Sequence, residues 1–441
     1  MRLFRALSFA MTTPFVSSTR TVLVLGGSYG GFGAAKFLSK ELPEGYRVVL
    51  LERNSHANHL YVIPRFSVIS SHEYKAFIPY DHLFGPTPGI HKVVHGTATK
   101  LEPNRVTYTP ASYTPDSSNG NQTIEFDYLV YALGATLPGP IDFWGAKNVH
   151  EKEVNLEAEK ARNGFNGTKP AAIEFLQRAQ ARLKEVESVL VVGGGALGIQ
   201  FATDLKDVYP QKQVTLLHSR MQLLPRFPEK MHGEINNTMH NLNVNLILGQ
   251  RLDLKTTLPE NAEYDEQGRR VVKTESGMRI CADLVLLCTG QSPNTALVRD
   301  LAPQAIDAKT GLVKVLQTMQ IDSPNSRFVA QDGTSGGQTN IPHIYAIGDA
   351  ADAFGAIKAG HTAYQQAEVA SKNIIASLSN NPLTPYEPGP PAIKLSLGLK
   401  HRATIMGAEQ TMTVGDDGKD DLDAPYMWPF LGADIERDKD L

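Results

Sequence analysis

The chain has 441 residues, of which 41% are hydrophobic and 20% charged. This composition is typical of an ordinary globular protein and excludes the disordered, fibrous and small disulfide-stapled classes. The formal net charge is −3, so no overall attraction to nucleic acid or anionic lipid is expected. The two cysteines, Cys281 and Cys288, are too few for a disulfide framework and lack CxxC spacing. We predict no metal site.

Residues 1–20 have the composition of a mitochondrial presequence, with Arg2, Arg5 and Arg20, several hydroxyl residues and no acid. A frayed tail, or a start at Met11, is the alternative, so the expected location is the cytoplasm or the mitochondrion. No apolar run approaches the roughly 20 residues of a membrane-spanning helix. We therefore expect no transmembrane segment, and we leave peripheral membrane contact open.

The first candidate site is a glycine-rich turn that follows a predicted strand over 21–25 and precedes a predicted helix over 32–40. A second strand, 47–51, ends at Glu52, about 20 residues beyond the turn. Glycine lets the backbone approach a pyrophosphate at the positive end of the helix, and the acid binds ribose hydroxyls. The order of elements favours dinucleotide binding over a tight turn without function, and the turn comprises Gly26, Gly27, Ser28, Tyr29, Gly30 and Gly31.

A second unit repeats this layout with an intact fingerprint of Gly193, Gly195 and Gly198. Its next strand, 214–217, ends at His218, Ser219 and Arg220, where no acid is present to repel an adenosine 2′-phosphate. Arg220 or a protonated His218 would attract that phosphate, so NADPH is expected to serve at least as well as NADH. If Arg220 instead stacks on adenine or faces solvent, the selectivity stays open.

Two dinucleotide units in one chain usually mean that one holds a flavin and the other a nicotinamide. A predicted strand over 125–135 brings Ala132 and Gly134 towards the first unit, and a predicted strand over 282–290 ends at Gly290 near the second. A further strand end carries Gly348 and Asp349, and a helix is predicted over 362–375. Asp349 is expected to accept hydrogen bonds from the ribityl chain of the flavin.

From residue 21 to about 407 these motifs together resemble the pyridine nucleotide-disulfide oxidoreductase family, within its branch of apoptosis-inducing factor and ferroptosis suppressor proteins. The resemblance implies an α/β fold with two Rossmann-like domains and a small α+β C-terminal domain. It also implies an FAD enzyme that takes hydride from NAD(P)H and reduces an acceptor, often a quinone. We predict an FAD-binding domain over 21–147 and 291–377, an NAD(P)-binding domain over 148–290 and a C-terminal domain over 378–441.

The resemblance also implies roles for residues outside the glycine turns. Lys358 is expected beside the flavin pyrimidine as a catalytic cation, with a solvated lysine as the alternative. Gln200 is expected to bond the nicotinamide carboxamide, with a buried helix contact as the alternative. Arg53 follows the ribose acid, and Arg65 lies in a segment expected to pass close to the flavin. That segment also contains His56, His59, Tyr61 and Pro64, whose histidines are more often structural than proton donors.

Departures from the family pattern narrow the chemistry. Arg2 excludes the N-terminal myristoylation motif. Disulfide reductases of the family have paired cysteines next to the flavin, and none stands directly after Glu52 here, so disulfide substrates are disfavoured. Cys281 and Cys288 are expected to flank one strand over 282–287, about 23 Å apart, which is too far for a disulfide.

The rival functions are a flavin-dependent dehydrogenase or oxidase of a biosynthetic pathway, a flavin monooxygenase and a nucleic-acid-binding death effector. The biosynthetic enzyme would have the same fold and cofactor. We find no monooxygenase motifs, and the net charge of −3 disfavours nucleic-acid binding.

Overall fold

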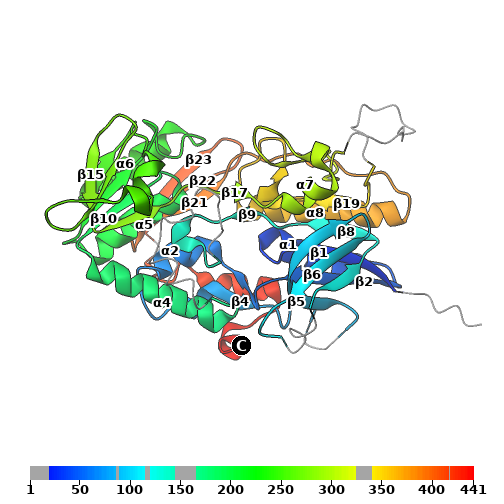
Figure 1. The fold of residues 1–441 in the computed structure, drawn as a ribbon. Coiled ribbons are helices and arrows are strands. Elements are labelled where there is room, and N and C mark those ends of the chain that lie inside the picture. The colour runs from blue at the N-terminus through cyan, green and yellow to red at the C-terminus, as the bar shows by residue number, and fades with distance from the viewer. Residues whose placement is uncertain (1–18, 86–88, 115–119, 145–164, 324–339, 417) are drawn as a thin grey trace, which may run out of the picture.

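The computed structural model describes residues 19–85, 89–114, 120–144, 165–323, 340–416 and 418–441 of the chain. The expected presequence, apart from its last two residues, and the expected domain boundary at 147 and 148 lie outside these ranges. Figure 1 shows two α/β bodies side by side, with orange C-terminal strands between them. Within the described residues, no helix has both the length and the hydropathy needed to cross a bilayer.

The first body is built on a seven-stranded sheet with strand order β19-β8-β1-β2-β5-β6-β7. The strands from β19 to β5 are parallel, and β6 and β7 extend the sheet antiparallel. Because helices cover a parallel sheet on both faces, its central strands consist almost wholly of buried apolar residues. The strands are β1 (Arg20–Leu25), β2 (Tyr46–Glu52), β5 (Lys92–Glu102), β6 (Arg105–Pro110), β7 (Gln122–Glu125), β8 (Tyr128–Tyr131) and β19 (Ile344–Ala346).

Two helices of this body pack against each other beside β1, where the glycine-rich turn lies. Helix α1 spans Tyr29–Glu41 and α8 spans Gly360–Leu378. An added Cβ at Gly33 would lie 2.7 Å from the ring of Tyr364, so the two helices approach closely. The glycines of α1 therefore serve helix packing as well as the turn.

The second body contains a four-stranded parallel sheet with strand order β12-β11-β10-β16. Beside it lies a three-stranded antiparallel sheet, β13-β14-β15. The helices of this part are α4 (Lys169–Glu185), α5 (Ala196–Val208) and α6 (Glu229–Asn241). The strands are β10 (Ser188–Val192), β11 (Gln213–Leu217), β12 (Asn245–Ile247), β13 (Glu263–Tyr264), β14 (Arg270–Lys273), β15 (Arg279–Ala282) and β16 (Leu284–Leu287).

The C-terminal part is an antiparallel sheet followed by short helices. Its strands are β21 (Ile393–Leu397), β22 (His401–Met406) and β23 (Thr411–Asp416), and the helices are η9 (Ala424–Leu431) and α9 (Ile435–Asp438). Trp428 of η9 is fully buried, and its indole N–H donates to the Lys75 carbonyl at 3.1 Å. The aromatic segment over 426–430 therefore packs into the first body through Trp428, while Tyr426 stays 73% exposed.

Short elements connect these sheets. They are β3 (His56–Asn58) paired with β4 (Phe77–Pro79), β9 (Ala135–Thr136) paired with β17 (Ser292–Pro293), β18 (Val313–Lys314) paired with β20 (Ala351–Asp352), and the helices α2 (Ile63–Phe66) and α7 (Ala296–Leu301).

Two long strands of the sequence prediction are each broken by an aspartate. Asp127 accepts the Thr21 N–H at 2.8 Å, and Asp283 accepts the Ser188 N–H at 2.7 Å. Asp127 thus bonds the start of β1 and Asp283 the start of β10, and each aspartate lies in the break between two strands, β7 and β8 or β15 and β16. The prediction that Cys281 and Cys288 flank one strand is wrong, because Cys281 lies in β15 and Cys288 follows β16. Both thiols are free.

A buried ion pair joins the three parts. Arg65 of α2 and Asp204 of α5 are 2.9 Å apart, and both side chains are fully buried. The same guanidinium donates to the carbonyls of Gly398, Leu399 and Asp420 in the C-terminal part. This one side chain therefore connects both bodies to the C-terminal part.

A second, more exposed contact joins α6 to the C-terminal sheet. The His401 ring of β22 lies 2.6 Å from the Glu234 carboxylate of α6 and 3.1 Å from the Asp416 carboxylate of β23. Burial lowers the pKa of His401, but the hydrogen bonds to the two carboxylates outweigh it, and the pKa is raised overall.

Candidate functional site

The first glycine turn joins β1 to α1. Gly26 has a φ of +90°, and its N–H donates to the Leu51 carbonyl at 2.9 Å. An added Cβ at Gly31 would lie 1.7 Å from the Gly26 carbonyl oxygen. Only glycine therefore fits at these two positions, as the sequence predicts for a turn that brings its backbone close to a phosphate.

The N-terminus of α1 is open at this turn. Ser28 occupies the N-cap position, is exposed, and makes no side-chain capping hydrogen bond. The first backbone N–H groups of a helix lack intrahelical acceptors and carry partial positive charge. This end of α1 can therefore receive an anionic group.

Glu52 ends β2 beside the turn, as predicted. One carboxylate oxygen accepts the Gly27 N–H at 2.6 Å, and the other accepts the backbone and side-chain N–H groups of Asn54, both at 2.9 Å. The Tyr80 hydroxyl donates to the Gly27 carbonyl at 2.6 Å, and an added Cβ at Gly27 would lie 2.3 Å from that hydroxyl oxygen. The Gly27 residue is therefore held from both sides, with the acid fixed next to it.

The Arg53 guanidinium lies over a tryptophan ring, next in the chain to Glu52. Its guanidinium lies 4.8 Å from the centre of the Trp144 ring, and the Trp144 indole N–H donates to the Asn54 side chain at 2.8 Å. The Tyr113 hydroxyl donates to the Arg53 carbonyl at 3.1 Å. A guanidinium stacked on an indole presents a planar surface of the kind on which a base stacks.

The predicted Ala132 and Gly134 follow β8 and lie against the first turn. The Ala132 N–H donates to the Leu25 carbonyl at 2.9 Å, and an added Cβ at Gly26 would lie 2.6 Å from the Ala132 carbonyl oxygen. Gly134 has a φ of +60°, and its carbonyl accepts the Asn294 N–H at 2.9 Å. These two residues thus form the carboxyl edge of the sheet next to the turn.

Gly348 and Asp349 come to the same edge from β19. The Gly348 N–H donates to the Gln366 side chain of α8 at 2.7 Å. Among the described residues, the Asp349 carboxylate has no hydrogen-bond donor, and its burial raises its pKa, although Lys358 opposes this. A half-buried carboxylate without a donor is costly in isolation. It is therefore a candidate to accept hydrogen bonds from a ligand.

Lys358 lies in the loop that leads into α8. Its ammonium donates to the Ala351 carbonyl. Partial burial lowers the pKa of Lys358, while Asp349 and Asp352 act to raise it. The lysine thus lies in the electrostatic environment of Asp349. Its catalytic role stays a prediction.

The histidine-rich segment reaches the first turn through Tyr29. The Tyr29 hydroxyl and the His59 Nδ1 atom are 2.8 Å apart, and the Tyr29 ring packs against Gly360 at the start of α8. Burial lowers the pKa of His59 to about 4 and contributes most to lowering that of His56 to about 3. Both histidines are therefore neutral at physiological pH. This agrees with the expectation that histidines in such a segment are more often structural groups than proton donors.

The second glycine turn has the same construction between β10 and α5. Gly193 has a φ of +121°, and an added Cβ at Gly198 would lie 1.9 Å from the Gly193 carbonyl oxygen. At Gly195 an added Cβ would meet no atom within 4 Å. Gly290 follows β16, and an added Cβ there would also meet no atom within 4 Å. The backbone at Gly195 is thus open to an approaching phosphate.

His218 directly follows β11, at the place where Glu52 lies in the first unit. Its Nδ1 atom accepts the Gly194 N–H at 3.1 Å, and its Nε2 atom lies 3.2 Å from the Gln222 carbonyl. Burial lowers the pKa of His218. The expectation that a protonated His218 attracts a phosphate therefore does not fit these contacts, whereas the Arg220 side chain is exposed and available.

The structure places two predicted cofactor ligands elsewhere. Arg65 makes the buried ion pair with Asp204 and three bonds to carbonyls, so its guanidinium is engaged between the domains. Gln200 is buried on α5 and donates to the Ser396 hydroxyl at 2.9 Å. Gln200 thus makes the buried helix contact that we named as its alternative.

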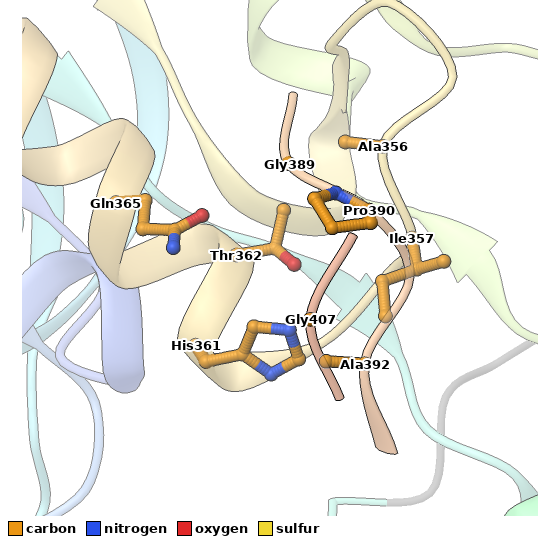
Figure 2. A pocket seen from close by; sticks show the side chains of 9 residues that line it. All are labelled: Ala356, Ile357, His361, Thr362, Gln365, Gly389, Pro390, Ala392 and Gly407. Carbon is orange, nitrogen blue, oxygen red and sulfur yellow. The ribbon is translucent and has the colours of Figure 1, made fainter. Parts of the chain in front are cut away.

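A cavity of about 180 Å³ lies at the N-terminus of α8, between the first body and the C-terminal part. Its apolar lining includes Ile357, Pro390 and Ala392, and Figure 2 shows them facing the polar side chains of α8. Thr362 is only 6% exposed, its hydroxyl points into this space (Figure 2), and no group of the described residues hydrogen-bonds to that hydroxyl. Gln365 and His361 of the same helix complete the polar side.

Sequence reasoning did not identify several of these residues. Tyr80 lies 53 positions from the carbonyl it binds, and no motif marks it. His361, Thr362 and Gln365 come shortly after the predicted Asp349 and Lys358 in the sequence. Polar side chains at the start of this predicted helix could have marked them as site residues. The missed site residues are Asn54, Tyr80, Tyr113, Trp144, His361, Thr362 and Gln365.

The chain is similar to known proteins over nearly its full length. Residues 20–372 match the family model described as pyridine nucleotide-disulphide oxidoreductase. The chain is 41% identical to Fe-regulated protein 8 of Mycosarcoma maydis, over 95% of this chain and 96% of that protein. It is 29% identical to mouse ferroptosis suppressor protein 1, over 86% of each chain. The fold is similar to that of the Aquifex aeolicus sulfide:quinone oxidoreductase, with a TM-score of 0.63 and 14% identity, covering 93% of this chain and 90% of that one.

The residues of both units fit the ligands that this family uses. The open helix end at Ser28, the acid at Glu52 and the carboxylate of Asp349 without a donor fit FAD, and the open backbone at Gly195 fits a nicotinamide dinucleotide. When bound, FAD supplies the acceptor for hydride and the donor of electrons. The chain belongs to the pyridine nucleotide-disulphide oxidoreductase family, in its branch of apoptosis-inducing factor and ferroptosis suppressor proteins, and is an FAD-dependent oxidoreductase that uses NAD(P)H.

Proposed function

We propose that this protein is an NAD(P)H:quinone oxidoreductase. In the overall reaction NAD(P)H reduces a quinone, which takes up two electrons and two protons to become a quinol, and FAD held at Ser28, Glu52 and Asp349 would supply the acceptor for the hydride. One proton comes from solvent, so that NAD(P)H, H⁺ and quinone give NAD(P)⁺ and quinol. The observation that carries this proposal is the cavity at the start of α8.

The cavity has the size and the chemistry for a quinone ring. An apolar cavity of about 150 Å³ is known to hold a benzene ring, and this one measures about 180 Å³. Its walls at Ile357, Pro390 and Ala392 suit a flat apolar ring. The Thr362 hydroxyl and the Gln365 amide are hydrogen-bond donors on one side, and a quinone carbonyl is an acceptor. Cys281 and Cys288 do not line this cavity, which supports a mechanism without thiols.

The test uses purified protein reconstituted with FAD and supplied with NADPH. Ubiquinone analogues, naphthoquinones, ferricyanide, a redox dye and oxygen are compared as acceptors by the rate of NADPH oxidation. We expect the highest kcat/KM with a quinone. Thr362→Val should raise the quinone KM about fivefold, the equivalent of a lost hydrogen bond of about 1 kcal/mol, and leave anaerobic flavin bleaching by NADPH unchanged.

Thr238→Val makes the same side-chain change on α6 and serves as the matched control. If no quinone is reduced faster than oxygen or the dye, the protein is not a quinone reductase, and a flavin-dependent dehydrogenase or oxidase becomes the better assignment. An equal effect of Thr362→Val and Thr238→Val would remove the cavity from the proposal.

A further inference from the structure

The two dinucleotide units share a hydrogen bond between the turn and the end of the next strand. In the first unit the Gly27 N–H donates to the Glu52 carboxylate at 2.6 Å. In the second unit the Gly194 N–H donates to the His218 Nδ1 atom at 3.1 Å. Both acceptors directly follow or end the strand that pairs with the first strand of the unit. An imidazole therefore makes the contact in the second unit that a carboxylate makes in the first.

The neighbours of His218 fix both its tautomer and its charge. Nδ1 must offer a lone pair because it accepts the Gly194 N–H, and Nε2 faces the Gln222 carbonyl, which can only accept. The proton therefore resides on Nε2, and the ring is neutral. A proton on Nδ1 would break the bond to the turn. Burial lowers the pKa of this ring, which acts in the same direction.

The ring also packs tightly against the turn. An added Cβ at Gly194 would lie 2.7 Å from Cγ of His218 and 2.4 Å from a methyl carbon of Leu223. The imidazole is therefore fixed against the Gly194 backbone, where the acid of a ribose-binding unit is expected. The next charged side chain, Arg220, is exposed, and among the described residues no side-chain hydrogen bond or ion pair engages its guanidinium.

We infer that His218 is the residue that makes this enzyme accept NADPH, because it holds the turn as an acid would but carries no negative charge. A carboxylate at the end of β11 would repel the 2′-phosphate, and a neutral imidazole does not. Arg220 then provides the charge that favours the phosphate. His218 is thus a specificity-determining residue through its neutrality, and Arg220 through its charge. This inference rests on the use of NAD(P)H and does not depend on the acceptor.

The test restores the acid in the FAD-loaded protein. His218→Glu keeps an acceptor for the Gly194 N–H and adds the missing charge, and His218→Gln keeps an acceptor without charge. Dissociation constants for NADPH and NADH are measured from the concentration dependence of anaerobic flavin bleaching, with no acceptor present. We expect His218→Glu to weaken NADPH at least tenfold and to leave NADH within about threefold. His218→Gln should keep both donors within about threefold.

Two controls separate charge at this position from general damage. His240→Glu introduces the same side chain at an exposed position on α6 and should change neither donor. Arg220→Ala should weaken NADPH and not NADH. Equal weakening of both donors by a His218→Glu protein with full FAD content, or no loss of NADPH binding, would overturn the inference.

A second measurement covers the case in which His218→Glu does not fold. Adenosine 2′,5′-bisphosphate and 5′-AMP are compared as competitive inhibitors of flavin bleaching in the unmodified protein. We expect the 2′-phosphorylated compound to bind at least tenfold more tightly. Equal inhibition would overturn the inference. Because neither measurement contains a quinone, a failure here is distinguishable from a failure of the proposed quinone reductase activity.

Discussion

Removal of the Arg65 guanidinium should destabilise the whole molecule without making FAD a weaker ligand of the folded protein. Arg65 and Asp204 are both fully buried and 2.9 Å apart, so Arg65→Met leaves an unpaired carboxylate in the interior. Loss of one partner of a buried ion pair costs about 3–5 kcal/mol. The three carbonyls that Arg65 also binds lose their donor at the same time, so we expect the upper part of this range.

The free energy of unfolding is measured in urea with saturating FAD, and the FAD dissociation constant is measured separately under native conditions. The double variant Arg65→Met with Asp204→Leu removes both charges and should recover most of the lost stability, because no isolated charge remains. Arg105→Gln is the matched control, since its ion pair with Glu102 is exposed and worth about 0–1 kcal/mol. A loss below about 1 kcal/mol would refute the reasoning. A normally stable Arg65→Met protein that binds FAD poorly would instead favour the sequence prediction that Arg65 is a cofactor ligand.

Three further predictions follow from the contacts described above. His401→Gln should lower stability most below about pH 6.5, the ordinary pKa of a histidine. The difference from the unmodified protein should vanish as the pH rises through the raised pKa of His401, as pH-dependent urea unfolding can measure. Gly198→Ala should reduce the yield of folded protein, because the added Cβ lies 1.9 Å from a backbone oxygen. Gly195→Ala should fold normally and raise the NADPH dissociation constant about tenfold or more, because its added Cβ meets no protein atom. The same thermal stability for both variants would count against this assignment of the turn. The double variant Cys281→Ser, Cys288→Ser should keep most of its activity per bound flavin, and a fully flavin-loaded protein without turnover on any acceptor would disprove a mechanism without thiols.

The nucleotide-binding units could be read from the sequence because their signals are local. A β-strand, a glycine-rich turn, a helix and a second strand occupy about 30 consecutive residues. Gly26 and Gly193 have the positive φ that such a turn requires, and Glu52 lies beside the turn as its spacing predicts. Hydrophobic runs likewise predicted the parallel strands, although β8 and β16 begin only after the aspartates at 127 and 283, later than predicted.

Charge states and distant partners were decided by the tertiary structure alone. Arg65 was read as a cofactor ligand, but its partner Asp204 is 139 residues away, and Gln200 reaches Ser396 over 196 residues. His218 was correctly located at the strand end, yet its neutrality follows from two backbone groups whose positions the sequence does not specify. Local motifs therefore determined where nucleotides bind, because the glycine turn and the acid are encoded within one unit. Packing decided which polar side chains remain available for a ligand, because a buried charge or donor must be satisfied by whichever group the fold brings to it.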